Sequence, residues 1–203
     1  MISEQLNKYD LILASGSPRR QEFFKRLGWP FRIATKAVEE IYDERLNGAE
    51  ITDFLAKKKA DAFGVLMADQ ILVTSDTIVW FNQRALEKPV DLADAKRMLQ
   101  TLSGQMHEVF TSVCITTKDT QKVVNDMTKV WFKTLSEDEI DYYVAQKSAL
   151  DKAGSYGIQD WLGYIGVERI EGCFFNVMGL PTRLVYHELK TLITQPNHYK
   201  TNP

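Results

Sequence analysis

One carboxylate stands inside a stretch of sequence that otherwise favours a buried β-strand. Asp76 lies in ILVTSDTIVWF, residues 71–81, where most neighbours are apolar or β-branched. Removing a carboxylate from water costs several kcal/mol unless it gains a cation or hydrogen-bond donors. We therefore predict that Asp76 belongs to a functional site; the alternative is a structural Asp paired with a neighbouring lysine. In a regular strand Thr77 points to the opposite side.

A short polar loop between a predicted strand and a predicted helix is a candidate anion site. The loop belongs to LILASGSPRR, residues 11–20, in which Ser17 is placed to cap the helix. Free N–H groups and the helix dipole attract anions there, whereas Arg19 and Arg20 oppose the dipole. A phosphate bound by Ser15, Ser17 and the two guanidinium groups explains these residues together, and two solvated arginines are the alternative. The P-loop and dinucleotide glycine patterns are both missing from the sequence.

A lysine and a glutamate extend the candidate site. Lys59 lies four residues after Leu55, on the predicted apolar stripe of its helix, whereas Lys57 faces away. Such a lysine either reaches a phosphate in a cleft or snorkels to the edge of the core. Glu40 follows an early extended segment and could join Asp76 at a hard cation such as Mg²⁺ or Mn²⁺, which takes oxygen ligands and bridges phosphates.

Two loops, residues 151–159 and 176–181, combine glycines with polar side chains. Such loops line a pocket or merely turn the chain. Gln159 could offer its amide to the N3–H and O4 edge of a pyrimidine, although any glutamine has the same capacity.

The elements that must position these residues alternate between strands and helices, with one hairpin. Periodicity, caps and turn residues predict strands at about 11–14, 70–81, 109–117 and 123–134, and helices at about 18–27, 52–67, 92–103, 136–146 and 182–193. The stretch 154–179 is glycine-rich. This order predicts an α/β protein whose mixed β-sheet carries flanking helices. We expect one two-lobed domain over 1–193 and a frayed tail over 194–203.

Composition excludes several classes of protein. With 203 residues, 44% apolar, 26% charged and a net charge of −2, the chain resembles an ordinary globular protein without a field that favours nucleic acid or anionic membranes. No run of about 18 apolar residues is present to span a bilayer. The two cysteines and three histidines lack the spacing of a disulfide framework or a zinc site, and we expect a cytoplasmic location.

The ordered motifs resemble those of the Maf family of nucleoside triphosphate pyrophosphatases over nearly the whole chain. The matching segments are ASGSPRR at 14–20, KA at 59–60, SDTIV at 75–79, EKP at 87–89, LSG at 102–104, DKAGSYGIQ at 151–159 and VMGLP at 177–181. The GIQ form is similar to the branch that acts on dTTP and UTP rather than on 7-methyl-GTP. Two departures are Ser75, where Ala is common, and Asp160-Trp161, where Gly often stands.

The resemblance implies a fold similar to that of the inosine triphosphate pyrophosphatases, with two lobes around a cleft, and usually a homodimer. It implies that Asp76 is the proton acceptor. Arg19, Thr77 and Gln159 match the positions that are associated with selection of the base in this family. Glu40, Lys59 and Lys88 match other residues of the family's cleft.

We therefore expect hydrolysis of dTTP and UTP to the monophosphate and pyrophosphate, by in-line attack of water on the α-phosphorus. Arg19, Arg20, Lys59 and Lys88 are expected to hold the phosphate chain, with Mg²⁺ or Mn²⁺ as cofactor. Two alternatives stay open: the 7-methyl-GTP activity of the same family, and a non-catalytic nucleotide-binding regulator of cell division. Neither nucleic acid nor a membrane is expected as a partner.

Overall fold

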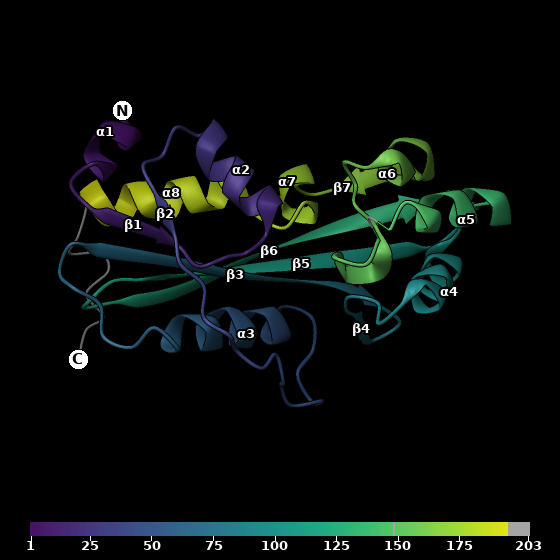
Figure 1. Cartoon of the computed structure of the whole chain (residues 1–203), viewed down its shortest axis with the longest axis horizontal. Helices are drawn as coiled ribbons and strands as arrows, with labels where there is room; N and C mark the ends of the chain where they lie inside the picture. Colours follow the sequence, from purple (N-terminus) through teal and green to yellow (C-terminus); the bar gives the residue numbers. More distant parts are fainter. Residues whose placement is uncertain (148, 195–203) are drawn as a thin grey trace.

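The strands of the protein form one mixed sheet. The computed structural model describes residues 1–147 and 149–194 (Figure 1). Its strands are β1 (Asp10–Leu13), β2 (Arg32–Ile33), β3 (Gln70–Phe81), β4 (Arg84–Leu86), β5 (Met106–Thr116), β6 (Gln121–Phe132) and β7 (Val167–Glu171). They lie in the order β2-β1-β3-β5-β6-β7, with β4 paired to β3. Because β1 is parallel to β2 and β3 while β5, β6 and β7 follow antiparallel, the predicted mixed α/β class is confirmed.

Helices cover both faces of the sheet. They are α1 (Ile2–Leu6), α2 (Pro18–Arg26), α3 (Ala49–Asp61), α4 (Leu92–Leu102), α5 (Glu137–Ala145), the 3-10 turn η1 (Ala153–Ser155), α6 (Trp161–Gly166), α7 (Phe174–Val177) and α8 (Thr182–Thr194). Figure 1 shows α3 on one face and α1, α2 and α8 on the other. Within the described ranges, no helix combines the length and apolar character needed to cross a membrane. The predicted tail, apart from Thr194, lies outside the described residues.

Local signals set three helix starts as predicted. Ser17 is the N-cap of α2 and a proline follows it, although the Ser17 side chain makes no capping hydrogen bond. Asp91 caps α4, where its Oδ1 accepts a hydrogen bond from the Asp94 N–H at 2.7 Å. The helix predicted from residue 136 is α5, and Ser136 and Glu139 form a capping box at its start.

Two other parts of the prediction are wrong or incomplete. The helix predicted over 52–67 is α3, which runs from Ala49 to Asp61 and is followed by a turn at Gly64 with φ of +72°. Leu66, whose spacing suggested a longer helix, is buried without being helical. The glycine-rich stretch 154–179 also contains α6, β7 and α7, which the sequence did not indicate because these short elements lack a clear period and depend on long-range packing.

Strand alternation divides the core between the two faces and the two ends of the sheet. At the β1 end, Ile71 packs in a cluster with residues of α2 and α8, while Leu72 packs on the opposite face with Ala56 of α3. At the far end, Leu99 and Tyr143 belong to a separate cluster with residues of α4, α5 and α6. The sheet therefore has two separately packed ends.

Between these ends, part of β3 lacks a neighbouring strand on one side. Pairing with β1 ends at Val73, and pairing with β4 begins at Val79. Among the described residues, the segment 74–78 pairs only with β5. On this side, the Ser75 carbonyl instead accepts a hydrogen bond from Arg20 Nη1 of α2 at 2.9 Å.

A buried histidine makes stability depend on pH. His107 is 1% exposed, packs edge-to-face on Phe132 and lies with Nε2 2.7 Å from the hydroxyl oxygen of Tyr156. Burial lowers the pKa of His107 to about 3, whereas the unfolded chain binds a proton there near pH 6.5. The stability from the neutral ring is therefore complete above pH 6.5 and is lost as pH falls toward 3.

We expect this single residue to account for about 2 kcal/mol of lost stability between pH 7.5 and pH 5. Urea unfolding of the wild type and His107→Gln at both pH values measures it, because glutamine keeps a polar partner for Tyr156 but does not titrate. An equal loss of unfolding free energy in both proteins would contradict the assignment.

Candidate active site

A cavity of about 660 Å³ opens at the uncovered segment of β3. Its walls come from the loop after β1, the start of α2, α3, the connection between β4 and α4, and the loop 151–159. All the predicted site residues line it: Ser15, Ser17, Arg19, Arg20, Glu40, Lys59, Asp76, Thr77, Lys88 and Gln159. The helices that follow β1 and β2 lie on opposite faces, which is where open α/β sheets bind ligands. The roles of the individual residues stay predictions.

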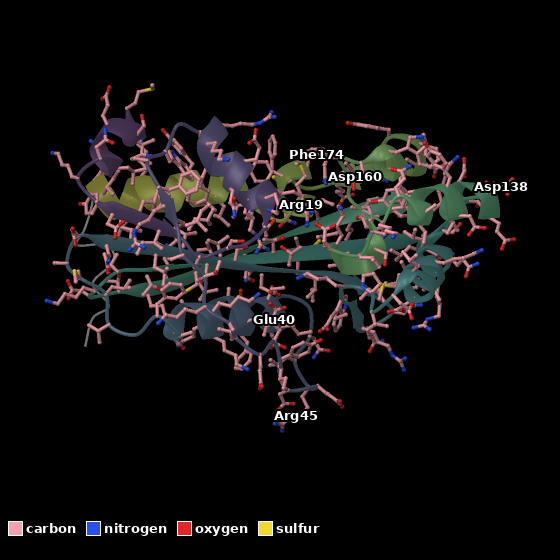
Figure 2. The ribbon with its side chains drawn as sticks, in the orientation of Figure 1. Arg19, Glu40, Arg45, Asp138, Asp160 and Phe174 are labelled. Carbon is pink, nitrogen blue, oxygen red and sulfur yellow. The ribbon has the colours of Figure 1, made fainter. Side chains whose placement is uncertain are left out.

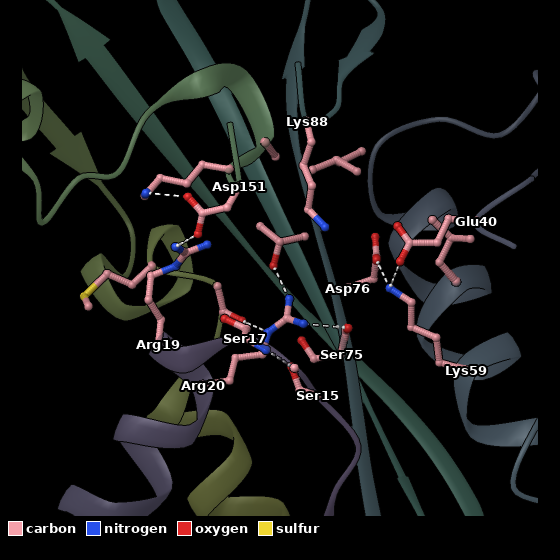
Figure 3. A pocket seen from close by; sticks show the side chains of 18 of the residues that line it. Ser15, Ser17, Arg19, Arg20, Glu40, Lys59, Ser75, Asp76, Lys88 and Asp151 are labelled. Carbon is pink, nitrogen blue, oxygen red and sulfur yellow. Dashed lines mark hydrogen bonds and ion pairs between the residues drawn. The ribbon is translucent and has the colours of Figure 1, made fainter. Parts of the chain in front are cut away.

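Two carboxylates share one ammonium group at the centre of the cavity (Figure 3). Lys59 Nζ lies 2.6 Å from Asp76 Oδ1 and 2.8 Å from Glu40 Oε1. The Lys59 side chain is 19% exposed and that of Asp76 is 8% exposed, whereas Glu40 is half exposed. Lys59 therefore ends inside the cavity and pairs with acids, rather than snorkelling to the edge of α3.

The two carboxylates differ in their affinity for protons. Burial raises the pKa of Asp76 above its ordinary value, because the opposing charges of Lys59 and Arg20 only partly offset the loss of water and Glu40 adds to the rise. Burial also acts to raise the pKa of Glu40, but the hydrogen bond to Lys59 and the nearby charge of Lys88 hold that pKa below its usual value. Asp76 is therefore the better proton acceptor of the pair.

Arg20 uses its guanidinium group to join three segments of the protein. Its Nε donates to the Gly179 carbonyl at 2.8 Å, Nη1 to the Ser75 carbonyl at 2.9 Å and Nη2 to Thr77 Oγ1 at 2.9 Å. The Ser75 carbonyl belongs to the β3 segment that lacks a strand neighbour. Thr77 and Asp76 point to opposite faces of β3, as period-2 alternation predicts, and both line the cavity.

The neighbouring arginine is held differently. Arg19 Nη1 pairs with Asp151 Oδ2 at 3.0 Å, and its side chain is one quarter exposed. Figure 3 shows Arg19 and Asp151 facing each other, while the Lys88 side chain extends toward the space between Arg20 and Asp76. Figure 2 shows Arg19 and Glu40 on opposite sides of the sheet. The cavity therefore presents cationic groups from several elements to a bound anion.

The two serines of the first loop organise its backbone. The Ser17 N–H donates to Ser15 Oγ at 3.2 Å, and Gln21 Nε2 donates to the Ser15 carbonyl at 3.1 Å. Ser15 is buried, whereas Ser17 is partly exposed. These contacts hold the loop in a turn directly before α2.

Gln159 lies at the rim formed by the loop 151–159, next to Asp160. Its Nε2 donates to Asp160 Oδ1 at 3.0 Å. Among the described residues, its Oε1 has no hydrogen-bond partner and is shielded from solvent.

Comparison with known proteins agrees with this geometry. A family model described as "Maf-like protein" matches residues 10–192. The chain belongs to the Maf family. It is similar to a dTTP/UTP pyrophosphatase of Flavobacterium johnsoniae, with 53% identity over 95% of this chain and 100% of that protein. It is also similar to a dTTP/UTP pyrophosphatase of Christiangramia forsetii, with 51% identity over 95% of this chain and 99% of that protein.

A solved structure of a HAM1 protein from Coxiella burnetii matches with a TM-score of 0.48 and 12% identity, over 90% of this chain and 98% of that one.

Two acids of the Maf cavity have the oxygen donors that a divalent metal ion takes. In the described part of the chain, no group of three or more His, Cys, Asp or Glu residues forms a metal site by itself. Glu40 and Asp76 nevertheless converge on one point, where Lys59 Nζ now lies between them. Mg²⁺ commonly binds through one or two carboxylates together with substrate phosphates. This donor pair suits such an ion.

Four charged residues that line the Maf cavity had no predicted role: Lys36, Glu87, Asp151 and Lys152. Glu87 lines it and accepts a hydrogen bond from the Tyr42 hydroxyl at 2.8 Å. Asp151 pairs with Arg19 and also accepts from Lys152 Nζ at 2.7 Å. The adjacent opposite charges at 151–152, directly before a glycine-rich segment, were the available signal, but the sequence does not show which distant residue they meet.

Proposed function

We propose that this Maf protein is a nucleotide pyrophosphatase that hydrolyses dTTP and UTP to the nucleoside monophosphate and pyrophosphate. The observation that carries the proposal is the buried Asp76 carboxylate, with its raised pKa, beside Lys59 in a cavity lined by further cations. A volume of about 660 Å³ is typical of sites for small organic ligands. The similar proteins of Flavobacterium johnsoniae and Christiangramia forsetii, both named dTTP/UTP pyrophosphatase, support this choice of substrate.

In this reaction Asp76 accepts a proton from the attacking water as oxygen bonds to the α-phosphorus. The bond from the α-phosphorus to the bridging oxygen breaks, and pyrophosphate leaves. Arg19, Arg20, Lys59 and Lys88 neutralise the phosphate chain and hold it in line with the water. Little covalent chemistry is required from the protein, since positioning and charge neutralisation dominate phosphoryl transfer.

A divalent cation belongs to the same proposal. Glu40 and Asp76 would hold it, and it would withdraw charge from the phosphate oxygens. We expect chelation with EDTA to abolish turnover and added Mg²⁺ or Mn²⁺ to restore it. Full turnover after chelation would remove the metal from the proposal without affecting the role of Asp76.

Pyrophosphate release from a panel of UTP, dTTP, CTP, GTP and 7-methyl-GTP tests the function. We expect UTP and dTTP to give the highest kcat/KM. A preference for 7-methyl-GTP would place the chain in the other activity of the family. Tight binding of UTP by folded protein without pyrophosphate release would favour a nucleotide-binding regulator.

A further inference from the structure

The orientation of the Gln159 amide follows from its neighbour. Gln159 Nε2 donates to Asp160 Oδ1 at 3.0 Å. A carboxylate oxygen can only accept a hydrogen bond, so the NH₂ end of the amide must face Asp160 and the carbonyl oxygen must lie at the other end. The two ends of this glutamine are therefore chemically assigned, although they have nearly the same shape.

The carbonyl oxygen is the end that lacks a partner. Gln159 lines the cavity, and its Oε1 is shielded from water without a hydrogen bond from any described residue. A buried acceptor without a donor is unfavourable, and a ligand that supplies a donor removes this penalty. Because the surrounding protein leaves Oε1 almost no accessible surface, a base reaches this oxygen only when the Gln159 side chain or the loop 151–159 shifts as the ligand binds.

Asp160 is itself fixed from the side opposite Gln159. The Tyr143 hydroxyl donates to Asp160 Oδ2 at 3.0 Å, and Lys152 Nζ lies 3.2 Å from the same oxygen. The Tyr143 hydroxyl in turn accepts from the Gly157 N–H at 3.1 Å. Oδ2 therefore faces two donors, and Oδ1 remains for Gln159.

Gly157 provides the space for this arrangement. A Cβ atom at Gly157 would lie 2.6 Å from Asp160 Oδ2 and 2.7 Å from Gln159 Nε2. Real Cβ atoms do not approach other atoms this closely, so any larger residue would displace the carboxylate or the amide. The glycine of the GIQ segment thus lets the Asp160–Gln159 pair lie against the backbone.

We propose that Asp160 is a positioning residue that selects the base by fixing the polarity of the Gln159 amide. Once a shift on binding exposes Oε1 to the base, Gln159 accepts the N3–H of uracil or thymine. The second hydrogen on Nε2 is placed to donate to a ring carbonyl beside N3. Cytosine presents a lone pair at N3 and meets the Gln159 oxygen with another lone pair. The inference rests on the proposed hydrolysis of dTTP and UTP.

Asp160→Asn provides a sharp test, because it changes donors without changing shape. Lys152 and Tyr143 both direct donors at the former Oδ2, so the asparagine oxygen should take that position and its NH₂ group should face Gln159. The Gln159 amide must then turn over and present N–H to the base. We expect kcat/KM for UTP to fall about tenfold or more, and the ratio of UTP to CTP kcat/KM to fall by a larger factor.

Three further variants complete the experiment. Gln159→Ala should lower the same ratio, and adding Asp160→Asn to Gln159→Ala should change it no further, because Asp160 acts through the amide. Asp119→Asn removes the same charge from an exposed turn and should leave the ratio unchanged. Thermal unfolding of each variant separates loss of fold from loss of selection.

The inference would be overturned if Asp160→Asn lowered kcat/KM for UTP and for CTP by the same factor. It would also be overturned if Asp160→Asn lowered the UTP to CTP ratio further in a protein that already carries Gln159→Ala. Neither result would contradict the proposed hydrolase activity. A wild-type protein that hydrolyses no nucleoside triphosphate would instead refute the proposed function, and the inference with it.

Discussion

Asp76→Asn is expected to lower kcat for UTP by about 10²–10⁴-fold, the range that a positioned proton acceptor supplies. Asparagine preserves the shape of the side chain. Among the described residues, the ion pair that the variant removes is the one between Asp76 and Lys59, and Lys59 keeps its pair with Glu40. KM should change less than kcat, because Asp76 acts on the attacking water in the transition state. Steady-state pyrophosphate release at saturating Mg²⁺ measures both constants.

The same variant should keep or raise the thermal stability. Burial raises the pKa of Asp76, so the ionised carboxyl costs stability at every pH above that raised pKa and costs nothing below the ordinary pKa of an unfolded Asp. Removing the charge therefore removes a cost at pH 7 to 8, as is common where activity requires a strained site. A large drop in Tm would show that Asp76 is architectural, and near-normal kcat would show that another group accepts the proton.

Lys59→Ala is expected to lower kcat/KM for UTP by about 10²–10³-fold, the usual effect of removing one preorganised partner of a developing charge. Lys59 also lowers the pKa of Asp76, while Glu40 raises it. Without the ammonium group, the pKa of Asp76 must rise further. The acid limb of the pH profile of kcat/KM should therefore move to higher pH, which a merely structural lysine would not cause.

Lys57→Ala is the matched control for this variant. Lys57 lies on the same helix, is about half exposed and pairs with Asp61 at 2.6 Å, away from the residues that line the cavity. It removes an equal charge and should leave both kcat/KM and the acid limb unchanged. If Lys59→Ala lowered Tm without altering the pH profile, Lys59 would serve the packing of α3 and not the reaction.

Much of the fold could be predicted because its signals are local. The limits of β3 follow from a continuous run of β-favouring residues, and the start of α5 follows from the Ser136–Glu139 capping box. The prediction of secondary structure is wrong where tertiary contacts, and not local conformational preferences, decide the structure. Leu66 is buried by packing without helical structure, and β7 forms because β6 offers it a partner.

Candidate site residues could be chosen for a related reason. A charged carboxylate at Asp76 is costly to bury in an apolar strand, and the positive charges of Arg19 and Arg20 are unfavourable at the N-terminus of a helix. Each of these conflicts can be seen within one short segment of sequence. The partners of these residues cannot be predicted in the same way, because nothing in the sequence distinguishes the contacts of Arg19 from those of Arg20. Only the structure shows that Arg20 bonds Ser75, Thr77 and Gly179, while Arg19 meets Asp151.

The sequence by itself determined the mixed α/β class, most of the long elements and ten of the residues that line the cavity. The tertiary structure alone decided where β3 loses its strand neighbour, which acids share Lys59, and how Asp160 orients Gln159. The physical reason is that caps and periodicity act within a few residues of chain. The direction of a hydrogen bond and the pKa of a buried carboxyl instead depend on groups that folding brings from distant segments.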